Sequence, residues 1–215
     1  MQRYSHLYIG GEWVEPLEPR DVELVDPTHE QVFATVSLGG AADAERAVAA
    51  ARRAFEAFST TTVDERVALI DRVIDVYESH IDEFSELIAK EVGIPVANRA
   101  QVTGPADHMR VARDLLRDYP FESRIGDAIV RREPIGVCAA ISPWNWPIQT
   151  GVIKVVYALA AGCTVVAKPS VNSAASGVLF ARVLDEAGLP PGVFNLVNGG
   201  GRDVGDTLSA TRTST

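Results

Sequence analysis

The residues best suited to chemistry lie in one short stretch, where an apolar segment runs into Ser-Pro-Trp-Asn-Trp-Pro at 142–147. The side-chain amide of Asn145 can both donate and accept hydrogen bonds. Downstream, Lys168 ends a second apolar segment and is followed by Pro169-Ser170. In isolation, Trp-Asn-Trp is more often a packed connection, and a lysine after a strand is more often a solvated charge. The neighbouring segments must therefore decide between these interpretations.

A third feature is the glycine pattern Gly199-Gly200-Gly201 with Gly205, placed after one apolar segment and before a short helical one. Glycines at a strand–helix turn can let a phosphate or ribose approach the backbone, but they are commonly present for steric reasons alone. The pattern by itself is a weak indication of nucleotide binding.

Other reactive side chains give little support for a second kind of site. Cys138 and Cys163 fall within apolar runs, so we expect buried, protonated thiols rather than a nucleophile. The four histidines, at positions 6, 29, 80 and 108, have no metal-ligand spacing, and we expect no metal site. Two cysteines are too few for a disulfide framework, which favours a reducing, cytoplasmic compartment.

Composition narrows the possible partners. The 215 residues carry a formal net charge of −9, with 47% hydrophobic and 23% charged residues. This balance is ordinary for a soluble protein, and the acidic excess argues against nucleic acid as a partner. No apolar run approaches the roughly 20 residues that cross a bilayer, and no hydrophobic signal segment follows the first residues. We therefore expect no membrane partner.

The first part of the chain predicts a hairpin followed by helices. Residues 8–14 form short apolar segments around Gly10-Gly11, which is typical of a β-hairpin, and a strand is expected over 31–36. A helix should begin near Asp43 as its N-cap. Thr62 and Glu65 form a capping-box pattern for a second helix, whose apolar face continues to Ile88 and which Gly93 closes.

Two further segments precede the second half. A helix over 98–118 should kink or restart at Gly104-Pro105. After Pro120, the alternating polarity of 128–134 predicts one exposed strand.

The second half predicts a parallel sheet. Strands are expected over 136–141, 164–168 and 193–197, alternating with helices over 148–161, 174–187 and 203–209. Nearly continuous apolar strands alternating with helices indicate an α/β fold, a Rossmann-like doubly wound parallel sheet. Ligands in such sheets bind beyond the carboxyl ends of the strands, where 142–147, Lys168 and Gly199–Gly205 are all expected to lie.

Several long motifs recur together in one order. They are Arg132-Glu-Pro-Ile-Gly-Val137, Ser142-Pro-Trp-Asn-Trp-Pro147, Ala158-Leu-Ala-Ala-Gly-Cys-Thr-Val-Val-Ala-Lys-Pro-Ser170 and Glu186-Ala-Gly-Leu-Pro-Pro-Gly-Val-Phe-Asn-Leu-Val-Asn-Gly199, with Glu91-Val-Gly-Ile-Pro95 upstream. Over roughly residues 7–208 the chain resembles the aldehyde dehydrogenase superfamily. The resemblance implies oxidation of an aldehyde to a carboxylic acid with NAD or NADP.

The resemblance also implies roles for individual residues. Asn145 would be the catalytic residue that donates its amide to the oxyanion formed when a thiol attacks the aldehyde. The other residues would bind the cofactor: Ile141, Ser142, Pro143 and Trp144 on the nicotinamide side, Lys168 and Ser170 at the adenosine ribose, and Gly201 and Gly205 at the adenine pocket.

Two positions depart from the family's pattern. Val171 stands where the family usually has a glutamate that shares the ribose hydroxyls, which leaves NAD and NADP open. Tyr157 stands where the family usually has a proline, and we expect it to straighten the helix and add bulk beneath the site.

The resemblance divides the chain into three parts. Residues 1–118 would hold the hairpin and helices packed on the cofactor domain, 119–135 an oligomerisation-arm strand, and 136–215 an incomplete cofactor-binding domain. In the usual strand order, 136–141 would be central beside a fourth strand, so its outer edge is expected to be open. The family's nucleophilic cysteine and general-base glutamate would lie further downstream.

The last five residues, 211–215, match none of this, which predicts a truncated chain without the catalytic domain and without activity on its own. The intact family enzyme would act as a homo-oligomer on a small aldehyde. The alternative is a non-catalytic fragment that binds nucleotide or associates with another subunit.

Overall fold

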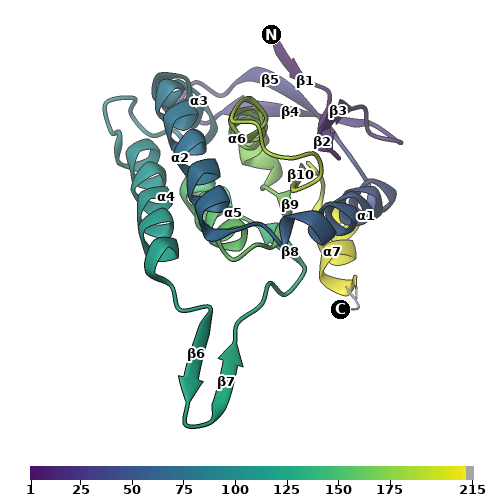
Figure 1. Ribbon diagram of the computed structural model, residues 1–215. Helices are drawn as coiled ribbons and strands as arrows, with labels where there is room; N and C mark the ends of the chain where they lie inside the picture. Colours follow the sequence, from purple (N-terminus) through teal and green to yellow (C-terminus); the bar gives the residue numbers. More distant parts are fainter. Residues whose placement is uncertain (212–215) are drawn as a thin grey trace.

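The main structural feature is a five-stranded sheet with the order β3-β2-β10-β9-β8. A computed structural model describes residues 1–211 of the chain (Figure 1). The strands are β2 (Leu7–Ile9), β3 (Glu12–Val14), β8 (Val137–Ile141), β9 (Thr164–Lys168) and β10 (Phe194–Leu196). Strands β8, β9 and β10 are parallel, which confirms the predicted doubly wound α/β fold. Strand β8 pairs only with β9 among the described residues, so its outer edge is open, as expected.

Helices cover both faces of this sheet, which explains why its parallel strands are apolar throughout. Helices α5 (Pro147–Ala160) and α6 (Ala174–Glu186) pack on one face. Helix α1 (Ala41–Phe58) covers the other, with the short α7 (Asp206–Ala210) beside it. The second face is therefore covered mainly by a helix from the first quarter of the chain, which the alternation of strands and helices did not predict.

The predicted hairpin is confirmed, and it belongs to the main sheet. Gly10 and Gly11 take φ angles of 68° and 87° between β2 and β3, the left-handed values that a two-residue hairpin turn requires. A Cβ on Gly11 would also come within 2.7 Å of the Pro191 side chain. Strand β2 runs antiparallel to β10, where Tyr8 pairs with Leu196. The first residues of the chain thus complete the sheet that carries the candidate site.

A second, three-stranded sheet has the order β1-β5-β4 and lies across the upper part of the molecule in Figure 1. Its strands are β1 (Gln2–Tyr4), β4 (Arg20–Asp26) and β5 (Gln31–Leu38). Only β5 was expected from the sequence. The other two alternate charged and apolar residues over short runs, which makes their period hard to recognise.

Helix α1 begins three residues earlier than expected. Its N-cap is Gly40, and Asp43 occupies the third helical position. The Asp43 carboxylate accepts a hydrogen bond from the backbone N–H of Gly40 at 3.1 Å and from that of Leu17 at 3.2 Å. The Asp43 carboxylate therefore binds the N–H of the N-cap residue from the third helical position, instead of being the N-cap itself.

The long second helix is two helices. Thr62 and Glu65 form the predicted capping box, with Glu65 N–H to Thr62 Oγ1 at 3.2 Å and Thr62 N–H to Glu65 Oε2 at 2.7 Å. Helix α2 (Val63–Ser79) then ends, and α3 (Ile81–Val92) begins after His80. The imidazole of His80 bonds Glu83 at 3.0 Å and Glu186 of α6 at 2.9 Å. The apolar face continues across this break, so the hydrophobic pattern does not reveal it.

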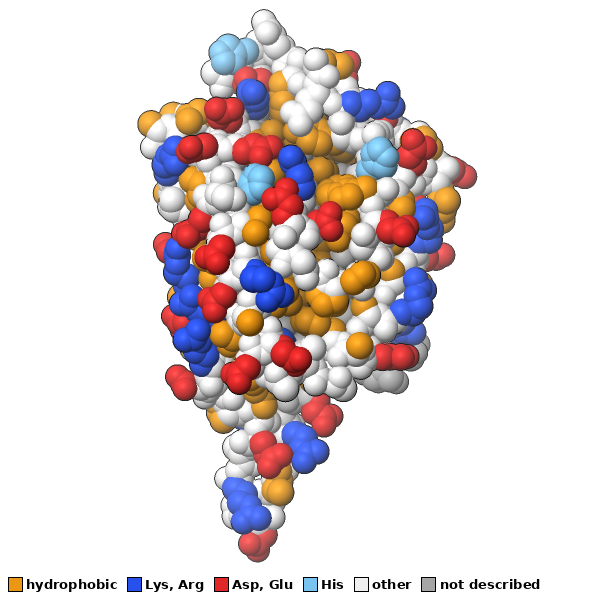
Figure 2. Space-filling view, turned by 45° about the horizontal axis from the view of Figure 1, so that its top comes forward, with side chains coloured by type: hydrophobic (Ala, Val, Ile, Leu, Met, Phe, Trp, Pro, Cys, Tyr) orange, Lys and Arg blue, Asp and Glu red, His pale blue; other side chains and the backbone are white. Residues whose placement is uncertain are grey.

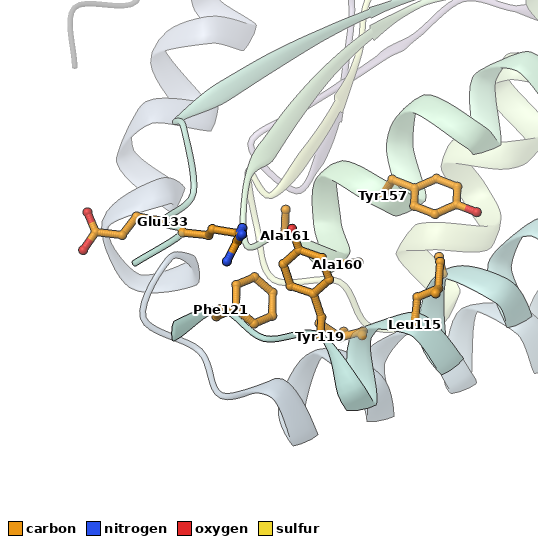
Figure 3. A pocket seen from close by; sticks show the side chains of 10 residues that line it. Leu115, Tyr119, Phe121, Glu133, Tyr157, Ala160 and Ala161 are labelled. Atoms are coloured by element: carbon orange, nitrogen blue, oxygen red, sulfur yellow. The ribbon is translucent and has the colours of Figure 1, made fainter. Parts of the chain in front are cut away.

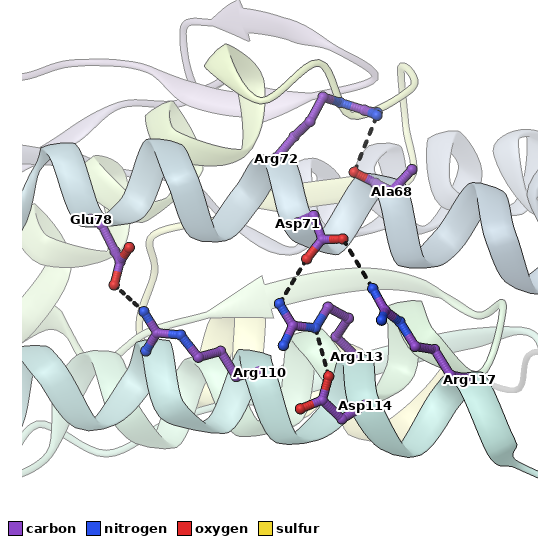
Figure 4. Close-up of polar contacts among 8 residues, drawn as sticks. All are labelled: Ala68, Asp71, Arg72, Glu78, Arg110, Arg113, Asp114 and Arg117. Atoms are coloured by element: carbon purple, nitrogen blue, oxygen red, sulfur yellow. Dashed lines mark hydrogen bonds and ion pairs between the residues drawn. The ribbon is translucent and has the colours of Figure 1, made fainter.

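Helix α4 (Ala100–Asp118) runs without interruption through Pro105, so the expected restart there is wrong. Charged pairs join α4 to α2 along their facing sides (Figure 4). Arg113 lies 2.9 Å and Arg117 3.6 Å from the Asp71 carboxylate, and Arg110 pairs with Glu78. These pairs are partly exposed and individually weak, but together they fix how α4 lies beside α2.

The predicted single strand at 128–134 is one half of a hairpin. Strands β6 (Glu122–Ile125) and β7 (Ala128–Arg131) pair in an antiparallel manner around Gly126, whose φ is 60°. This arm projects from the body of the molecule, with charged side chains along it (Figures 1 and 2). Its partner strand was missed because Glu122–Ile125 has no apolar alternation.

None of the helices within residues 1–211 combines the length and apolar character needed to cross a bilayer.

Candidate functional site

Three loops meet beyond the carboxyl ends of β8, β9 and β10. The backbone N–H of Ser142, just after β8, donates to the carbonyl of Lys168 at the end of β9, at 3.1 Å. After β10, the Asn198 carbonyl accepts from Gly39 N–H at 2.8 Å. The parallel register therefore brings the predicted site segments to one edge of the sheet, and backbone hydrogen bonds hold them there.

The loop with Asn145 is exposed at this edge. Trp146 is the N-cap residue of α5 and Pro147 its first residue, a position that suits proline because its missing N–H has no helical partner. The Gln101 side chain of α4 donates to the Asn145 carbonyl at 3.3 Å. The Asn145 amide itself has no hydrogen-bond partner within residues 1–211 and remains available to a ligand. Trp144 and Trp146 are 51% and 40% exposed, so neither side chain is buried against the sheet.

Lys168 points inward rather than into solvent. Its side chain is buried, and Nζ donates to the carbonyls of Pro169 and Gly199 at 3.0 Å each. Burial lowers the pKa of this lysine. An ammonium has three N–H donors, and these two bonds leave one for a further acceptor. The interpretation as a solvated charge is wrong.

The loop from Gly199 to Gly205 closes over the lysine. A Cβ on Gly199 would lie 2.2 Å from Val204 Cγ2, so only glycine fits there. The residues Gly201–Gly205 form one π-helical turn before α7, and Val204 N–H and Gly205 N–H both donate to the Gly200 carbonyl. Gly201 is exposed with open space at its missing Cβ, whereas one on Gly205 would lie 3.6 Å from Lys168 Cε. The predicted helix over 203–209 is thus a π turn followed by a short α-helix.

A backbone N–H in the first turn of α6 already binds a carboxylate from another part of the chain. Ser170 precedes a 3₁₀ turn, Val171–Ser173, and its carbonyl accepts from Ser173 N–H at 3.0 Å. Glu91, at the end of α3, accepts a hydrogen bond from Ser176 N–H at 3.0 Å in the first turn of α6. Glu91 is fully buried, and this burial raises its pKa to about 7. Its second oxygen has no partner among the described atoms.

A small cavity of about 20 Å³ lies between α5, α6 and the sheet, lined in part by Ser142, Pro147, Pro169 and Gly177. It is large enough for about one water molecule. Tyr157 lies elsewhere: it lines a surface pocket of about 330 Å³ with Leu115, Tyr119 and Phe121 (Figure 3). The expectation that Tyr157 adds bulk beneath the site is therefore wrong, because it sits towards the opposite end of α5.

The two cysteines differ from each other. Cys163 is buried as expected, whereas Cys138 on the edge strand is only half-buried. The expectation that both thiols are buried is therefore wrong for Cys138. The interaction between the two thiols raises the pKa of Cys138 and lowers that of Cys163. No cluster of three or more His, Cys, Asp or Glu side chains suited to a metal ion occurs within residues 1–211.

The structure therefore places the predicted residues Ile141–Asn145, Lys168, Ser170, Gly201 and Gly205 around one edge of the sheet. Sequence reasoning missed Gln101 and Glu91, which come from α4 and α3 and hold this edge in place. It also missed Asn198, whose buried amide has no partner among the described atoms. Glu91 and Asn198 lay within recognised motifs, but nothing in those motifs indicated what either residue contacts.

Comparison with known proteins decides the family. The model of the aldehyde dehydrogenase family matches residues 13–214. The chain belongs to the aldehyde dehydrogenase family. The match extends beyond residue 208, so the expectation that the similarity ends there is wrong, although residues 212–215 of the expected unmatched tail lie outside the described residues.

Individual family members resemble the chain over nearly all its length. It is 45% identical over 213 residues to a 3-succinoylsemialdehyde-pyridine dehydrogenase of a Pseudomonas species, covering 98% of this chain and 45% of that protein. Among solved structures, an aldehyde dehydrogenase of Bartonella henselae has a TM-score of 0.95 with 38% identity, over 98% of this chain and 45% of that one.

A mutant aldehyde dehydrogenase C of Pseudomonas syringae, solved with NAD+ and octanal, has a TM-score of 0.94 with 47% identity. It matches 96% of this chain and 43% of its own. The chain thus spans less than half the length of these relatives.

Proposed function

We propose that this chain forms the cofactor wall and supplies the oxyanion donor of an NAD(P)-dependent aldehyde dehydrogenase that converts an aldehyde to a carboxylic acid. The proposal rests on two groups at the same sheet edge. The Asn145 side-chain amide has no partner among the described residues, and the Lys168 ammonium uses only two of its three N–H donors. The P. syringae relative, which was solved with NAD+ and an aldehyde, supports the same assignment.

The residues at this edge fit a dinucleotide. Lys168 retains one N–H for a ribose hydroxyl, since only two of its three donors are used. Gly201 leaves open space beside the backbone, where a flat ring can approach closely. The first turn of α6 already binds the Glu91 carboxylate, so we expect the phosphates to be held elsewhere than at that helix end.

Each of the site residues has a defined role in the proposed reaction. Bound cofactor would accept the hydride. Ile141, Ser142, Pro143 and Trp144 form the wall that orients the nicotinamide, and Lys168 with Ser170 orients the adenosine ribose. The Asn145 amide stabilises the oxyanion that forms when a thiolate attacks the aldehyde, and the Gln101 bond to its carbonyl limits how far the loop can move.

The choice between NAD and NADP depends on Val171. An apolar side chain cannot accept hydrogen bonds from the ribose hydroxyls, which weakens binding of NAD. It also removes a negative charge that would repel a 2′-phosphate. Both cofactors therefore remain part of the proposal.

We do not assign the attacking thiolate to Cys138 or Cys163, because both lie away from Asn145, at the amino ends of β8 and β9. In the family's pattern the nucleophile and the general base lie downstream of the matched motifs. We therefore expect the 215 residues alone to bind cofactor without oxidising aldehydes. The free cysteines favour a cytoplasmic location for the chain.

A fluorescence titration tests the binding proposal. Trp144 and Trp146 are exposed beside the expected nicotinamide position, whereas Trp13 bonds Asp185 on the hairpin side of the sheet. NAD+ or NADP+ should quench the emission saturably, and Trp144→Phe should remove much of this response while Trp13→Phe leaves it intact. Absence of saturable quenching with both cofactors would contradict the proposal.

A second candidate is a non-catalytic fragment that associates with another subunit, in line with the homo-oligomers expected for intact family members. The projecting β6–β7 arm favours it, because Ile125 and Ile129 are 69% and 53% exposed. Sedimentation of the chain alone distinguishes the candidates. A dimer that dissociates in Ile125→Ser/Ile129→Ser, with no cofactor binding in either form, would favour association as the function.

A further inference from the structure

A buried arginine beside the root of the projecting arm lacks a counter-charge. Arg66, near the start of α2, is only 6% exposed. Its Nη1 donates to the Thr61 carbonyl at 2.8 Å, its Nε is buried without a partner, and its Nη2 forms no hydrogen bond within residues 1–211. A guanidinium that is taken out of water normally lies beside an anion, because burial of an unpaired charge is costly. The surroundings of Arg66 are therefore suited to a negatively charged ligand.

The acidic side chains around Arg66 do not supply this charge. Glu65 is the preceding residue, but its carboxylate accepts from the N–H and the hydroxyl of Thr62 at 2.7 and 2.9 Å in the capping box. Glu122 pairs with an arginine of β7 at 3.2 Å. Glu133 is exposed, and its carboxylate points away from the aromatic rings labelled in Figure 3. Each of these carboxylates is thus engaged or directed elsewhere.

Arg66 lines a surface pocket of about 300 Å³ between the start of α2, the arm and the end of α5. Arg131 and Arg132 line the same pocket from the arm. Arg132 uses its Nη1 for the Pro120 carbonyl at 3.0 Å, and its Nε and Nη2 form no hydrogen bond in the described part of the chain. The Phe121 ring lies 5.4 Å from the guanidinium carbon of Arg66, which helps to orient that group. Two guanidinium groups with unused donors therefore line one pocket of a size that suits a small molecule.

We propose that this pocket binds a small organic oxyanion, the carboxylate or phosphate group of a metabolite, through Arg66 and Arg132. A guanidinium presents parallel N–H donors that match either group. The ligand supplies the counter-charge that Arg66 lacks. The site is separate from the proposed cofactor edge, since Pro134 and Ala161, which also line the pocket, precede the amino ends of β8 and β9.

A bound oxyanion would join the arm to the body of the molecule. Arg66 belongs to α2, whereas Arg132 follows β7, where the arm returns to the main sheet. A ligand held by both residues would restrain the arm relative to α2. We therefore expect occupancy of the pocket to slow hydrogen–deuterium exchange over residues 120–134.

Nuclear magnetic resonance titration tests the proposal through the arginine Nε–H signals of the isotope-labelled chain. The probes are inorganic phosphate and benzoate, which distinguish the two kinds of oxyanion, and sodium chloride at matched ionic strength is the control. The Arg66 signal is assigned by its loss in Arg66→Lys. We expect this signal to shift saturably with at least one probe. A shift of the same size with sodium chloride, or no saturable shift with either probe, would overturn the proposal.

Matched variants assign the binding to the two residues. Arg66→Lys keeps the charge but loses the paired donors and should weaken binding by about tenfold. Arg132→Gln alters an exposed residue that the fold does not depend on, and it should weaken binding by about two- to fivefold. Arg124→Gln, an exposed arginine of β6 outside the pocket, should have no effect. Circular dichroism confirms that each variant is folded.

Two results with these proteins would also overturn the proposal. One is equal weakening of binding by Arg132→Gln and Arg124→Gln. The other is an Arg66 signal that shifts with chain concentration rather than with the probes, because the counter-charge would then come from a second copy of the chain.

Discussion

The two ends of strand β9 place a buried ionisable group in opposite surroundings. At the carboxyl end, Lys168 donates to the carbonyls of Pro169 and Gly199. At the amino end, the Cys163 side chain is buried in the turn that precedes β9. The first environment holds a cation and offers its remaining donor to a ligand. The second holds a buried thiol.

The difference follows from strand direction. The loops that leave the three parallel strands meet at the carboxyl edge, and the segments that enter these strands lie at the opposite edge. The two edges lie at opposite ends of the same strands, so they can have separate functions. Changes at the carboxyl edge should therefore alter cofactor binding, and changes at the amino edge should alter stability and leave cofactor binding unchanged.

The largest expected effect concerns Asn145. In a full-length family protein that contains this chain, Asn145→Ala should lower kcat by about 10²–10³-fold, because it removes an oxyanion donor. The KM for the cofactor should change little. Steady-state kinetics with NAD+ measure both. The control is Asn172→Ala, an exposed amide next to Val171. Equal activity of Asn145→Ala and the unmodified enzyme would contradict the proposed role.

A pH effect is expected at the start of α6. The pKa of Glu91 is raised from 4.5 to about 7 in the folded chain, so folding favours its protonated form. The resulting stabilisation is complete below pH 4.5 and is lost as pH rises through 7, amounting to about 3 kcal/mol.

Urea unfolding at pH 5 and pH 8 measures this change. Glu91→Gln should flatten the pH dependence, whereas Glu86→Gln, an exposed carboxyl on the same helix, should not. His80 also loses stabilisation as pH rises, since its bond to Glu186 raises its pKa, so the comparison between these two variants isolates Glu91. Identical pH slopes in both would refute the assignment.

Cofactor binding should depend on the Lys168 ammonium. Lys168→Met keeps the buried stem and removes the donor, which should weaken NAD(P)+ binding by about tenfold or more, as expected for a hydrogen bond from a charged group. Calorimetric titration measures the change. Lys90→Met, an exposed lysine on α3, serves as the control. If both substitutions have the same effect, Lys168 does not bind the ribose.

Substitution of a glycine at the amino edge should lower the stability of the chain and leave cofactor affinity unchanged. Gly162 has a φ of 85°, and an added Cβ would lie 2.9 Å from the Pro134 ring. Gly162→Ala should destabilise the chain by about 1–3 kcal/mol with no loss of cofactor affinity. Gly188→Ala is the matched control, since its φ is also positive but nothing lies within 4 Å, so its effect should be smaller. A loss of cofactor affinity in Gly162→Ala would break the separation of the two edges.

The smallest expected effect concerns cofactor choice. Val171→Glu places a carboxylate beside the expected ribose and should improve NAD+ over NADP+ by roughly fivefold, through hydrogen bonds to the hydroxyls and repulsion of a 2′-phosphate. Val171→Gln, which adds similar bulk without charge, is the control. Parallel titrations with the two cofactors measure the ratio, and an unchanged ratio in Val171→Glu would place residue 171 outside the ribose pocket.

Much of the second half could be predicted because its signals are local. Continuous apolar runs predicted β8, β9 and β10, and the motifs around Asn145 and Lys168 indicated one sheet edge. The break at His80 could not be predicted, because the apolar pattern continues through it and the Glu186 contact of His80 comes from more than a hundred residues away. Gln101 and Glu91 were missed for the same reason: their roles depend on where α4 and α3 pack.

Strand β6 lacks the alternation that identified β7, so the arm appeared as a single strand. For His80, Gln101 and Glu91 the missing information was a contact between distant segments, whereas for β6 it was the local pattern of the segment itself.

Hydrogen–deuterium exchange with and without saturating NAD+ tests the central claim most directly, because it reads both edges of the sheet in one sample. We predict slower exchange over residues 141–146, 168–173 and 199–205 when NAD+ is bound, and unchanged exchange over 135–138 and 162–164. Protection centred on the amino edge, or no protection at the carboxyl edge at saturation, would contradict the account.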